Sequence, residues 1–280
     1  MMYIGSHVSI SKGGYAAAAK TAYGIGGTAF QYFPKNPRSL VTKPLWNHQD
    51  TEACARFSKE NGLLSIAHAP YPLNLAADQP QQRIMLDALI NALEITEACG
   101  SVGLVVHFGK YRGKDSLQGY KNIIQLINEA LRHWKGKSLL LLENQAGEGS
   151  VMGTTMEELV QVRSLCETPD KIGFCLDTCH AFASGIWKGA DWQRFEETGV
   201  KLGYFQQLKA VHLNDSLYPS GSRRDRHANI GQGQIGTDAI KQLLASYYLK
   251  EIPVVLETGA ARDGTHRIEI ALVRKLAENP

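Results

Sequence analysis

Strand-like and helix-like segments alternate eight times along this chain, and this alternation limits its fold more than any other feature. Short runs rich in aliphatic and β-branched residues predict strands at residues 3–8, 28–33, 63–68, 102–107, 138–143, 172–177, 208–213 and 252–257. Amphipathic segments predict helices at residues 15–22, 51–61, 81–99, 119–133, 155–166, 192–204, 237–247 and 267–278. Eight strands, each followed by a helix, predict an α/β fold in which residues 1–280 form one domain, a single (β/α)8 TIM barrel.

The length and composition agree with one globular barrel. The chain has 280 residues, of which 44% are hydrophobic and 20% charged, and a formal net charge of +3. TIM barrels typically contain about 250 residues. A doubly wound sheet usually opens with a GxGxxG loop, which is absent after the first predicted strand. We therefore favour the barrel over the doubly wound fold.

The cysteines and the N-terminal segment indicate the compartment. The five cysteines are odd in number, form no CxxC pair and mostly lie in apolar segments, as is typical of reduced, buried thiols. The opening segment, MMYIGSHVSISKGG, lacks the basic and apolar regions of a secretion signal. No apolar run approaches the roughly 18 residues of a membrane span. We expect a cytoplasmic protein with no membrane partner.

Seven of the predicted strands end at or near an ionisable residue that can bind a metal. These residues are His7, His68, His107, Glu143, Asp177, His212 and Glu257. In a TIM barrel the C-terminal ends of the strands converge on one rim, so these side chains would share one pocket. Burying them at the ends of apolar strands such as LLLLE costs several kcal/mol each unless they are paired or coordinated. Metal binding would provide that compensation.

Two further motifs enlarge the set of candidate ligands. DTCH places His180 three residues beyond Asp177, where it can face the same rim from the loop after the sixth strand. RDRH places Asp225 and His227 on one side of an extended loop after the seventh strand. The candidate ligands are then His68, His107, Glu143, Asp177, His180, His212, Asp225, His227 and Glu257. Because one zinc ion takes four or five ligands, the set predicts two or three clustered ions. Imidazole and carboxylate ligands suit zinc or manganese, and the Irving–Williams order favours zinc.

A cluster of metal ions at such a rim is suited to phosphodiester hydrolysis. The ions can generate hydroxide near neutral pH and stabilise both the attacking and the leaving oxygen. Basic and aromatic residues of the predicted rim loops could hold a nucleic-acid backbone. They are Lys35, Arg38, Tyr71, Lys110, Tyr111, Arg112, Arg223, Arg224 and Arg226.

Several long motifs carry a resemblance to a known family. They are YIGSHVS at the N-terminus, AFQYFPKNPRS at the second strand, HAPYPLNLA at His68, GFCLDTCHAFASG at Asp177, and HLNDS followed by GSRRDRHANIGQGQIG at His212. On these motifs the chain resembles endonuclease IV, the AP endonuclease family 2, essentially from end to end. The resemblance implies a TIM barrel with three Zn2+ ions, with Mn2+ a possibility at one position. It also implies cleavage of DNA 5′ to an abasic site, leaving a 3′-hydroxyl, and removal of blocked 3′ ends.

The resemblance also implies roles for individual residues. The three ligand sets would be His68, His107 and Glu143; Glu143, Asp177, His212 and Glu257; and His180, Asp225 and His227. Glu143 would bridge the first two ions, a hydroxide between them would be the nucleophile, and the third ion would stabilise the leaving oxygen. We expect Glu143 and Glu257 to be catalytic.

The implied partner is double-stranded DNA with abasic sites or blocked 3′ ends, bound by a monomer. Arg38 and Tyr71 would enter the minor groove and help to flip out the abasic nucleotide, and Lys35 and Arg226 would also contact DNA. The chain departs from the family pattern at four positions near the DNA-facing loops, namely Phe108, Pro72, Leu217 and Ala228. None of them removes a ligand, so they bear on substrate preference and rate.

Two alternatives stay open. A metal-dependent sugar isomerase or epimerase also gathers Glu, Asp and His at the ends of its later strands, but it has no use for His180 or the RDRH loop. A DNA-binding or scaffold protein with decayed chemistry is the other alternative, and the complete set of nine ligand-type residues argues against it.

Overall fold

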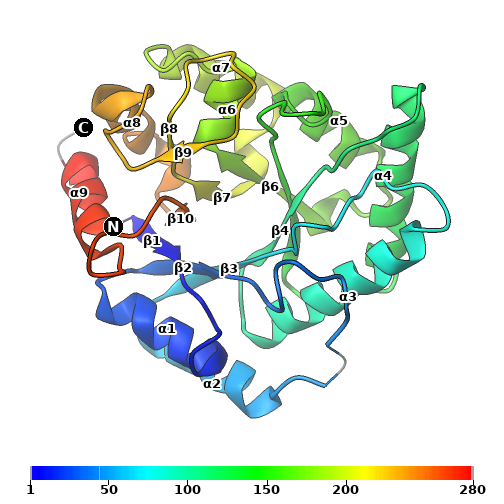
Figure 1. The fold of residues 1–280 in the computed structure, drawn as a ribbon, viewed down its shortest axis with the longest axis horizontal. Helices are drawn as coiled ribbons and strands as arrows, with labels where there is room; N and C mark the ends of the chain where they lie inside the picture. Colours follow the sequence, from blue (N-terminus) through cyan, green and yellow to red (C-terminus); the bar gives the residue numbers. More distant parts are fainter. Residues whose placement is uncertain (1, 44, 279–280) are drawn as a thin grey trace.

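The computed structural model describes residues 2–43 and 45–278, and in them parallel strands form a closed barrel surrounded by helices (Figure 1). The barrel strands of this part of the chain are β1 (Tyr3–His7), β2 (Ala29–Tyr32), β3 (Leu64–His68), β4 (Gly103–His107), β5 (Leu139–Glu143), β6 (Ile172–Asp177), β7 (Leu208–His212) and β10 (Pro253–Leu256). They follow one another around the barrel in chain order, and β10 pairs with β1 to close it. The predicted (β/α)8 barrel is confirmed.

Helices follow the strands and cover the outside of the barrel (Figure 1). The α-helices are α1 (Gly14–Gly24), α2 (His48–Glu60), α3 (Gln82–Ala98), α4 (Ser116–Leu131), α5 (Met156–Leu165), α6 (Thr178–Ser184), α7 (Trp192–Leu202), α8 (Gly236–Leu244) and α9 (Arg267–Glu278). Short 3-10 helices lie at Pro169–Lys171, Phe205–Gln207 and Tyr247–Leu249. Within the described residues, no helix has both the length and the apolar character needed to cross a membrane.

Capping residues explain where several helices begin. The Asn47 side chain accepts a hydrogen bond from the Asp50 amide, and the Asp115 side chain accepts one from the Leu117 amide. These caps start α2 and α4 three residues earlier than the hydrophobic pattern predicts, because the cap satisfies amides that precede the apolar face. Helix α5 begins with a capping box between Thr155 and Glu158.

Two elements were not predicted from the sequence. Helix α6 follows β6 with no intervening loop, and a two-stranded antiparallel ribbon joins β8 (Asp215–Ser216) to β9 (His227–Ala228). The residues around His180 and His227, expected in loops, therefore lie in or beside regular structure.

One apolar layer fills the inside of the barrel. It consists of Ala29, Ile66, Val105, Leu141, Cys175, Ala210 and Val255, each from a different strand. β1 contributes Gly5, which pairs with Ala29 and Val255. A Cβ on Gly5 would lie 1.6 Å from the Ala29 carbonyl oxygen, so only glycine fits at this close approach. The five cysteines are buried and free, as predicted, and Cys175 points into the barrel.

Candidate metal centre

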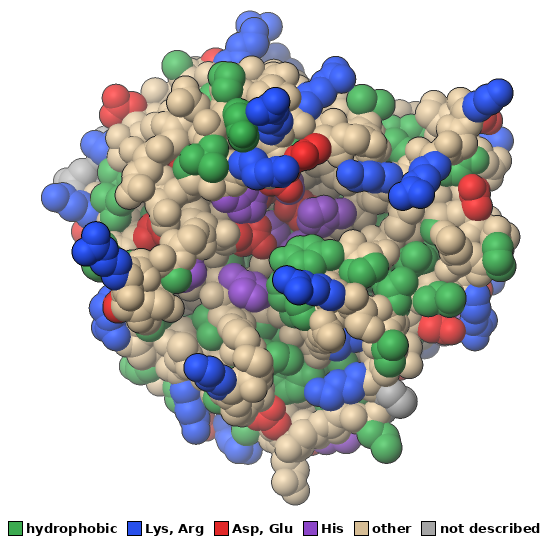
Figure 2. Space-filling view, in the orientation of Figure 1, with side chains coloured by type: hydrophobic (Ala, Val, Ile, Leu, Met, Phe, Trp, Pro, Cys, Tyr) green, Lys and Arg blue, Asp and Glu red, His purple; other side chains and the backbone are tan. Residues whose placement is uncertain are grey.

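The strand period places one polar side chain in or just after every barrel strand in a single layer at the rim. Because side chains alternate between faces, the residue two positions after each member of the apolar layer also points inward. Those residues are His7, Gln31, His68, His107, Glu143, Asp177, His212 and Glu257. Histidine and acidic side chains are visible near the centre of this face, with Lys and Arg side chains around it (Figure 2). The strand-end residues predicted to share one pocket therefore lie in one layer at the rim.

The first cluster consists of His68, His107 and Glu143, whose ligand-type atoms lie within 4.8 Å of one another. Glu143 Oε2 lies 3.0 Å from His107 Nε2 and 3.4 Å from His68 Nε2. His68 Nδ1 lies 2.7 Å from the Ala69 carbonyl oxygen, which can only accept, so Nδ1 carries the proton and the Nε2 lone pair faces the cluster.

The second cluster consists of Glu143, Asp177, His212 and Glu257. His212 Nδ1 lies 2.9 Å from Glu143 Oε1 and 3.3 Å from Glu257 Oε2. Glu143 therefore presents one oxygen to the first cluster and the other to the second, as a bridging ligand would.

The third cluster consists of His180, Asp225 and His227. Asp225 lies between the two imidazoles, with Oδ2 3.2 Å from His180 Nε2 and Oδ1 3.2 Å from His227 Nε2. Asp177 caps α6 by accepting a hydrogen bond from the His180 amide at 2.7 Å, and this turn brings His180 back to the rim. On the other side, pairing of His227 with Ser216 anchors the loop that carries Asp225.

Metal ions would satisfy the buried polar atoms of these clusters better than the hydrogen bonds between the clustered side chains do. Among the described residues, buried Glu143 Oε2 and His227 Nε2 make no well-directed hydrogen bond, although His107 Nε2 and Asp225 Oδ1 lie 3.0 and 3.2 Å from them. Such unsatisfied buried groups are costly, and cations placed at these atoms would satisfy them. A further combination includes Cys179 with Asp177 and His227. Burial raises the pKa of the Cys179 thiol to about 12, so it is neutral and the poorer ligand.

The pKa values of Glu143 and His227 shift in opposite directions, and both shifts favour the charged form of the side chain. Burial opposes ionisation of Glu143, but His107 and His212 hold the pKa of this carboxyl well below its usual range. Burial by itself would lower the pKa of His227, but Asp225 and Asp177 raise it to about 9. Glu143 is therefore charged, and His227 is protonated at neutral pH in the metal-free protein, so a metal must displace a proton.

Metal loading should consequently release protons. At pH 7.5, below the pKa of about 9 of His227, we expect zinc binding to the metal-free protein to release at least one proton, and zinc affinity should rise with pH up to about 9. Calorimetric titration in two buffers of different ionisation enthalpy would measure the release. Asp225→Asn is the comparison, since loss of this carboxylate lowers the pKa of His227 and should reduce the release. An equal enthalpy in both buffers would contradict the expectation.

Three residues that support the ligands were missed in the sequence. Asp177 Oδ2 accepts a hydrogen bond from Asn214 Nδ2 at 2.7 Å, and the Asn144 carbonyl oxygen lies 2.8 Å from His180 Nδ1. Gln31 contacts both His212 and Glu257. Their positions in the sequence could have indicated them. Asn144 and Asn214 come one and two residues after the strand-end ligands Glu143 and His212, and Gln31 lies in β2 at the same height in the barrel as the ligands of the other strands.

Of the four residues predicted to contact DNA, three lie in the rim loops with accessible side chains, and the fourth, Lys35, is buried. Arg38 and Tyr71 lie on adjacent rim loops, where the Tyr71 amide donates to the Pro37 carbonyl and its ring lies 5.0 Å from that of Phe33. Arg226 is exposed and forms an ion pair with Glu148 at 3.0 Å. These positions leave the predictions for Arg38, Tyr71 and Arg226 open.

Lys35 requires a correction. Only 6% of the residue is exposed, and its Nζ donates to the Ala88 carbonyl oxygen in α3 at 3.1 Å. Burial lowers the pKa of this ammonium to about 8. The side chain is held inside the protein by a helix carbonyl, so the expected phosphate contact is not supported by its position.

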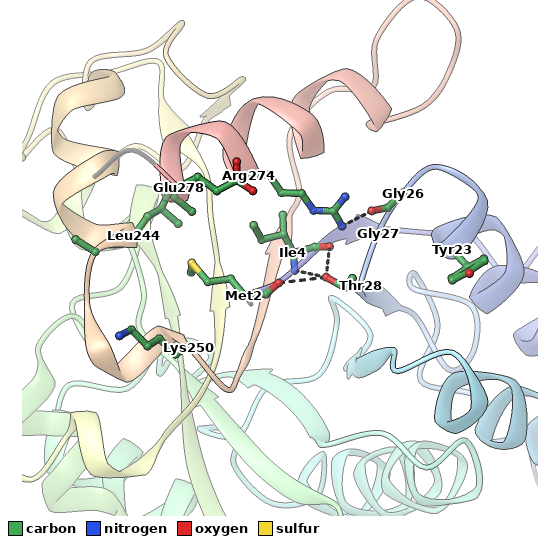
Figure 3. Close-up of a pocket in the computed structure, with 12 residues that line it drawn as sticks. Met2, Ile4, Tyr23, Gly26, Gly27, Thr28, Leu244, Lys250, Arg274 and Glu278 are labelled. Atoms are coloured by element: carbon green, nitrogen blue, oxygen red, sulfur yellow. Dashed lines mark hydrogen bonds between the residues drawn. The ribbon is translucent and has the colours of Figure 1, made fainter.

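One cavity lies beside the rim, and another lies at the opposite end of the barrel. A cleft of about 650 Å³ beside His107 is lined by Tyr71, Lys110, Arg112 and other loop residues. Another cavity, of about 960 Å³, lies at the N-terminal end of the strands, where Thr28 hydrogen-bonds Met2 and Ile4 and Arg274 donates to the Gly26 carbonyl (Figure 3). Its polar side chains join segments of the fold, as is typical of the face that stabilises a TIM barrel.

The fold and the rim clusters define a class of TIM-barrel protein that can gather metal ions at the C-terminal ends of its strands. Residues 18–276 match the family described as xylose isomerase-like TIM barrel. Within that class the chain belongs to the endonuclease IV family. It is 44% identical to a probable endonuclease 4 of Symbiobacterium thermophilum, over 99% of this chain and 100% of that protein. The crystal structure of endonuclease IV from Thermus thermophilus superposes with a TM-score of 0.88 at 32% identity, over 99% of this chain and 100% of that one.

Sugar epimerases share the fold. A D-tagatose 3-epimerase-like protein superposes with a TM-score of 0.73 over 99% of this chain and 98% of that one, but the two are only 18% identical. That likeness concerns the barrel alone.

Proposed function

We propose that this protein is a zinc-dependent AP endonuclease of base excision repair. It hydrolyses the phosphodiester bond 5′ to an abasic site in duplex DNA, leaves a 3′-hydroxyl, and also removes blocked 3′ ends. The proposal includes action as a monomer in the cytoplasm. Membership of the endonuclease IV family supports nuclease chemistry on DNA. The observation that carries the proposal is three neighbouring imidazole and carboxylate clusters, two of which share Glu143.

The proposed ligand sets follow the clusters. His68, His107 and Glu143 would hold one zinc ion; Glu143, Asp177, His212 and Glu257 a second; and His180, Asp225 and His227 a third, with Mn2+ possible at one position. Bound ions would supply Lewis-acid stabilisation of the phosphoryl oxygens and lower the pKa of water toward neutrality.

The chain contributes orientation and charge to this chemistry. Hydrogen bonds from His68 Nδ1 to the Ala69 carbonyl and from His180 Nδ1 to the Asn144 carbonyl fix the ring orientations and leave each Nε2 free as a donor to metal. Glu143 and Glu257 supply negative charge at the centre of the site. Lys and Arg side chains surround the rim (Figure 2). Cations of the rim loops, including the exposed Arg38, would position the phosphates of the duplex.

The direct test combines elemental analysis of the purified protein with incision of a duplex that carries one abasic site. About three zinc equivalents per chain, with cleavage 5′ to the lesion, would support the proposal. One equivalent without incision would favour the sugar isomerase alternative, and a full metal complement without incision would favour a decayed DNA-binding protein.

Arg38 provides a test of the DNA surface. We expect Arg38→Ala to weaken binding to abasic duplex about 3- to 10-fold and to reduce the slope of log affinity against log salt by about one, since one phosphate or groove contact is lost. Arg132→Ala is the matched control, because Arg132 is exposed at the C-terminal end of α4. Fluorescence anisotropy at several salt concentrations measures both quantities. An affinity and slope equal to those of Arg132→Ala would remove Arg38 from the interface.

A further inference from the structure

Gln31 is the one neutral amide in the rim layer of eight inward-facing residues. It is the third residue of β2, pairs with His7 of β1 and Ile66 of β3, and has 0% of its surface exposed. Burying an amide among metal-ligand residues is costly unless its hydrogen bonds are made there. The contacts of this side chain therefore indicate its role.

Both ends of the Gln31 amide contact proposed metal ligands. Gln31 Nε2 donates to Glu257 Oε1 at 2.6 Å, and Gln31 Oε1 lies 2.7 Å from His212 Nε2. The orientation of the amide follows from chemistry, since an ionised carboxylate can only accept and must face the NH2 group. The carbonyl oxygen is then left for the imidazole.

This orientation determines which nitrogen of His212 is available to a metal. The Gln31 oxygen can only accept, so His212 Nε2 keeps its proton, and Nδ1 is the nitrogen that can bind a metal once the proton shared with Glu143 is displaced. Nδ1 is the nitrogen that faces Glu143 Oε1 and Glu257 Oε2, at 2.9 and 3.3 Å. The same amide occupies Glu257 Oε1 and leaves Oε2 directed at the cluster.

We propose that Gln31 is a positioning residue that selects the Nδ1-coordinating tautomer of His212 and orients Glu257, and so sets the metal affinity of the second cluster alone. The inference rests on the proposed metal-binding function. The hydrogen-bonding contacts of the Gln31 side chain are to His7, His212 and Glu257, and none of these three belongs to the first or the third cluster. Loss of the amide should therefore affect one metal ion of three.

The test replaces Gln31 by Met, which keeps the length of the side chain and removes both hydrogen-bonding groups. Gln82→Met is the matched control, because Gln82 is also buried and bonds to Asn122 and Gln79 rather than to a proposed ligand. Zinc content is measured in buffers of fixed free zinc. We expect Gln31→Met to bind one of its three ions about 10- to 100-fold more weakly while the other two keep their affinity, and Gln82→Met to match the wild type.

A second variant tests whether the effect of Gln31→Met comes from the lost hydrogen bonds or from a misfolded barrel. Gln31→Glu keeps an acceptor for His212 Nε2 but faces Glu257 with a carboxylate, so the His212 tautomer should persist while Glu257 is displaced. Imidazole 15N spectra of the zinc-loaded proteins report the tautomer, which should be lost in Gln31→Met and retained in Gln31→Glu. Unchanged zinc affinity and an unchanged His212 tautomer in Gln31→Met would overturn the inference. Absence of zinc from the wild type would instead overturn the proposed function.

Discussion

Replacing Glu143 by Gln should abolish incision at an abasic site, with kcat reduced at least about 1,000-fold, or roughly 4 kcal/mol of transition-state stabilisation. The reason lies in the two oxygens of this side chain. Oε1 is 2.9 Å from His212 Nδ1, and Oε2 is 3.0 Å from His107 Nε2. An amide keeps the volume but removes the negative charge and turns an NH2 group toward one of these clusters.

The measurement needs a fold control and a metal count. Circular dichroism should show an intact barrel in Glu143→Gln, because no core volume is lost, and elemental analysis should show fewer zinc equivalents than in the wild type. Glu97→Gln is the matched control: this partly buried carboxylate accepts hydrogen bonds from the Lys137 and Ser138 amides, and it should retain full activity. Wild-type kcat in Glu143→Gln would exclude Glu143 from the active site.

The barrel and most of its rim could be predicted because the apolar strand pattern locates the strand ends and the parallel barrel topology brings those ends together. Apolar runs that end in a charged or imidazole side chain locate the strand ends, and the parallel barrel brings those ends to one rim. Gln31 was missed for a physical reason. The prediction depended on ionisable side chains, and an amide within AFQYF resembles an ordinary polar residue of a strand unless the inward level is counted on every strand.

His180 was expected in the loop after the sixth strand because two signals overlap in the segment DTCH. Asp177 is the last residue of β6 and also the N-cap of α6, so the helix begins where the strand pattern ends. A helix of seven residues also offers little amphipathic period to detect. The position of His180 at the rim was nevertheless predicted, because both a loop and this helix return the third residue toward the strand end.

The loop contacts were the least predictable part of the site. Lys35 and Arg38 are three positions apart on one loop, yet Lys35 turns inward to the Ala88 carbonyl whereas Arg38 stays accessible to solvent. Loop residues lack the period that assigns a face to strand and helix residues, so their direction depends on the packing of neighbouring elements. The Ala88 carbonyl accepts a hydrogen bond from Lys35 Nζ and so holds the side chain inward, and no sequence pattern predicts this contact.

Removal of the metal ions should destabilise the barrel as well as inactivate it. Glu143, Asp177 and His212 are almost fully buried at the rim, and without a cation their charges are compensated only by neighbouring imidazoles, carboxylates and amides of the rim. Ligands that bind only the folded state at about 1,000 times their Kd each contribute about 4 kcal/mol, and about 1 kcal/mol corresponds to about 2–4 °C for chains of about 150–250 residues. We therefore expect chelation to lower Tm by at least about 10 °C.

Differential scanning calorimetry of the chelated and zinc-restored protein measures this shift, with elemental analysis to verify both states. Zinc should restore Tm and incision together, because the same side chains supply both. Glu143→Gln should show a smaller zinc-dependent shift, since it lacks the carboxylate shared by two clusters. An unchanged Tm after verified removal would contradict this expectation, and would mean that the buried carboxylates and imidazoles of the rim compensate one another without a cation.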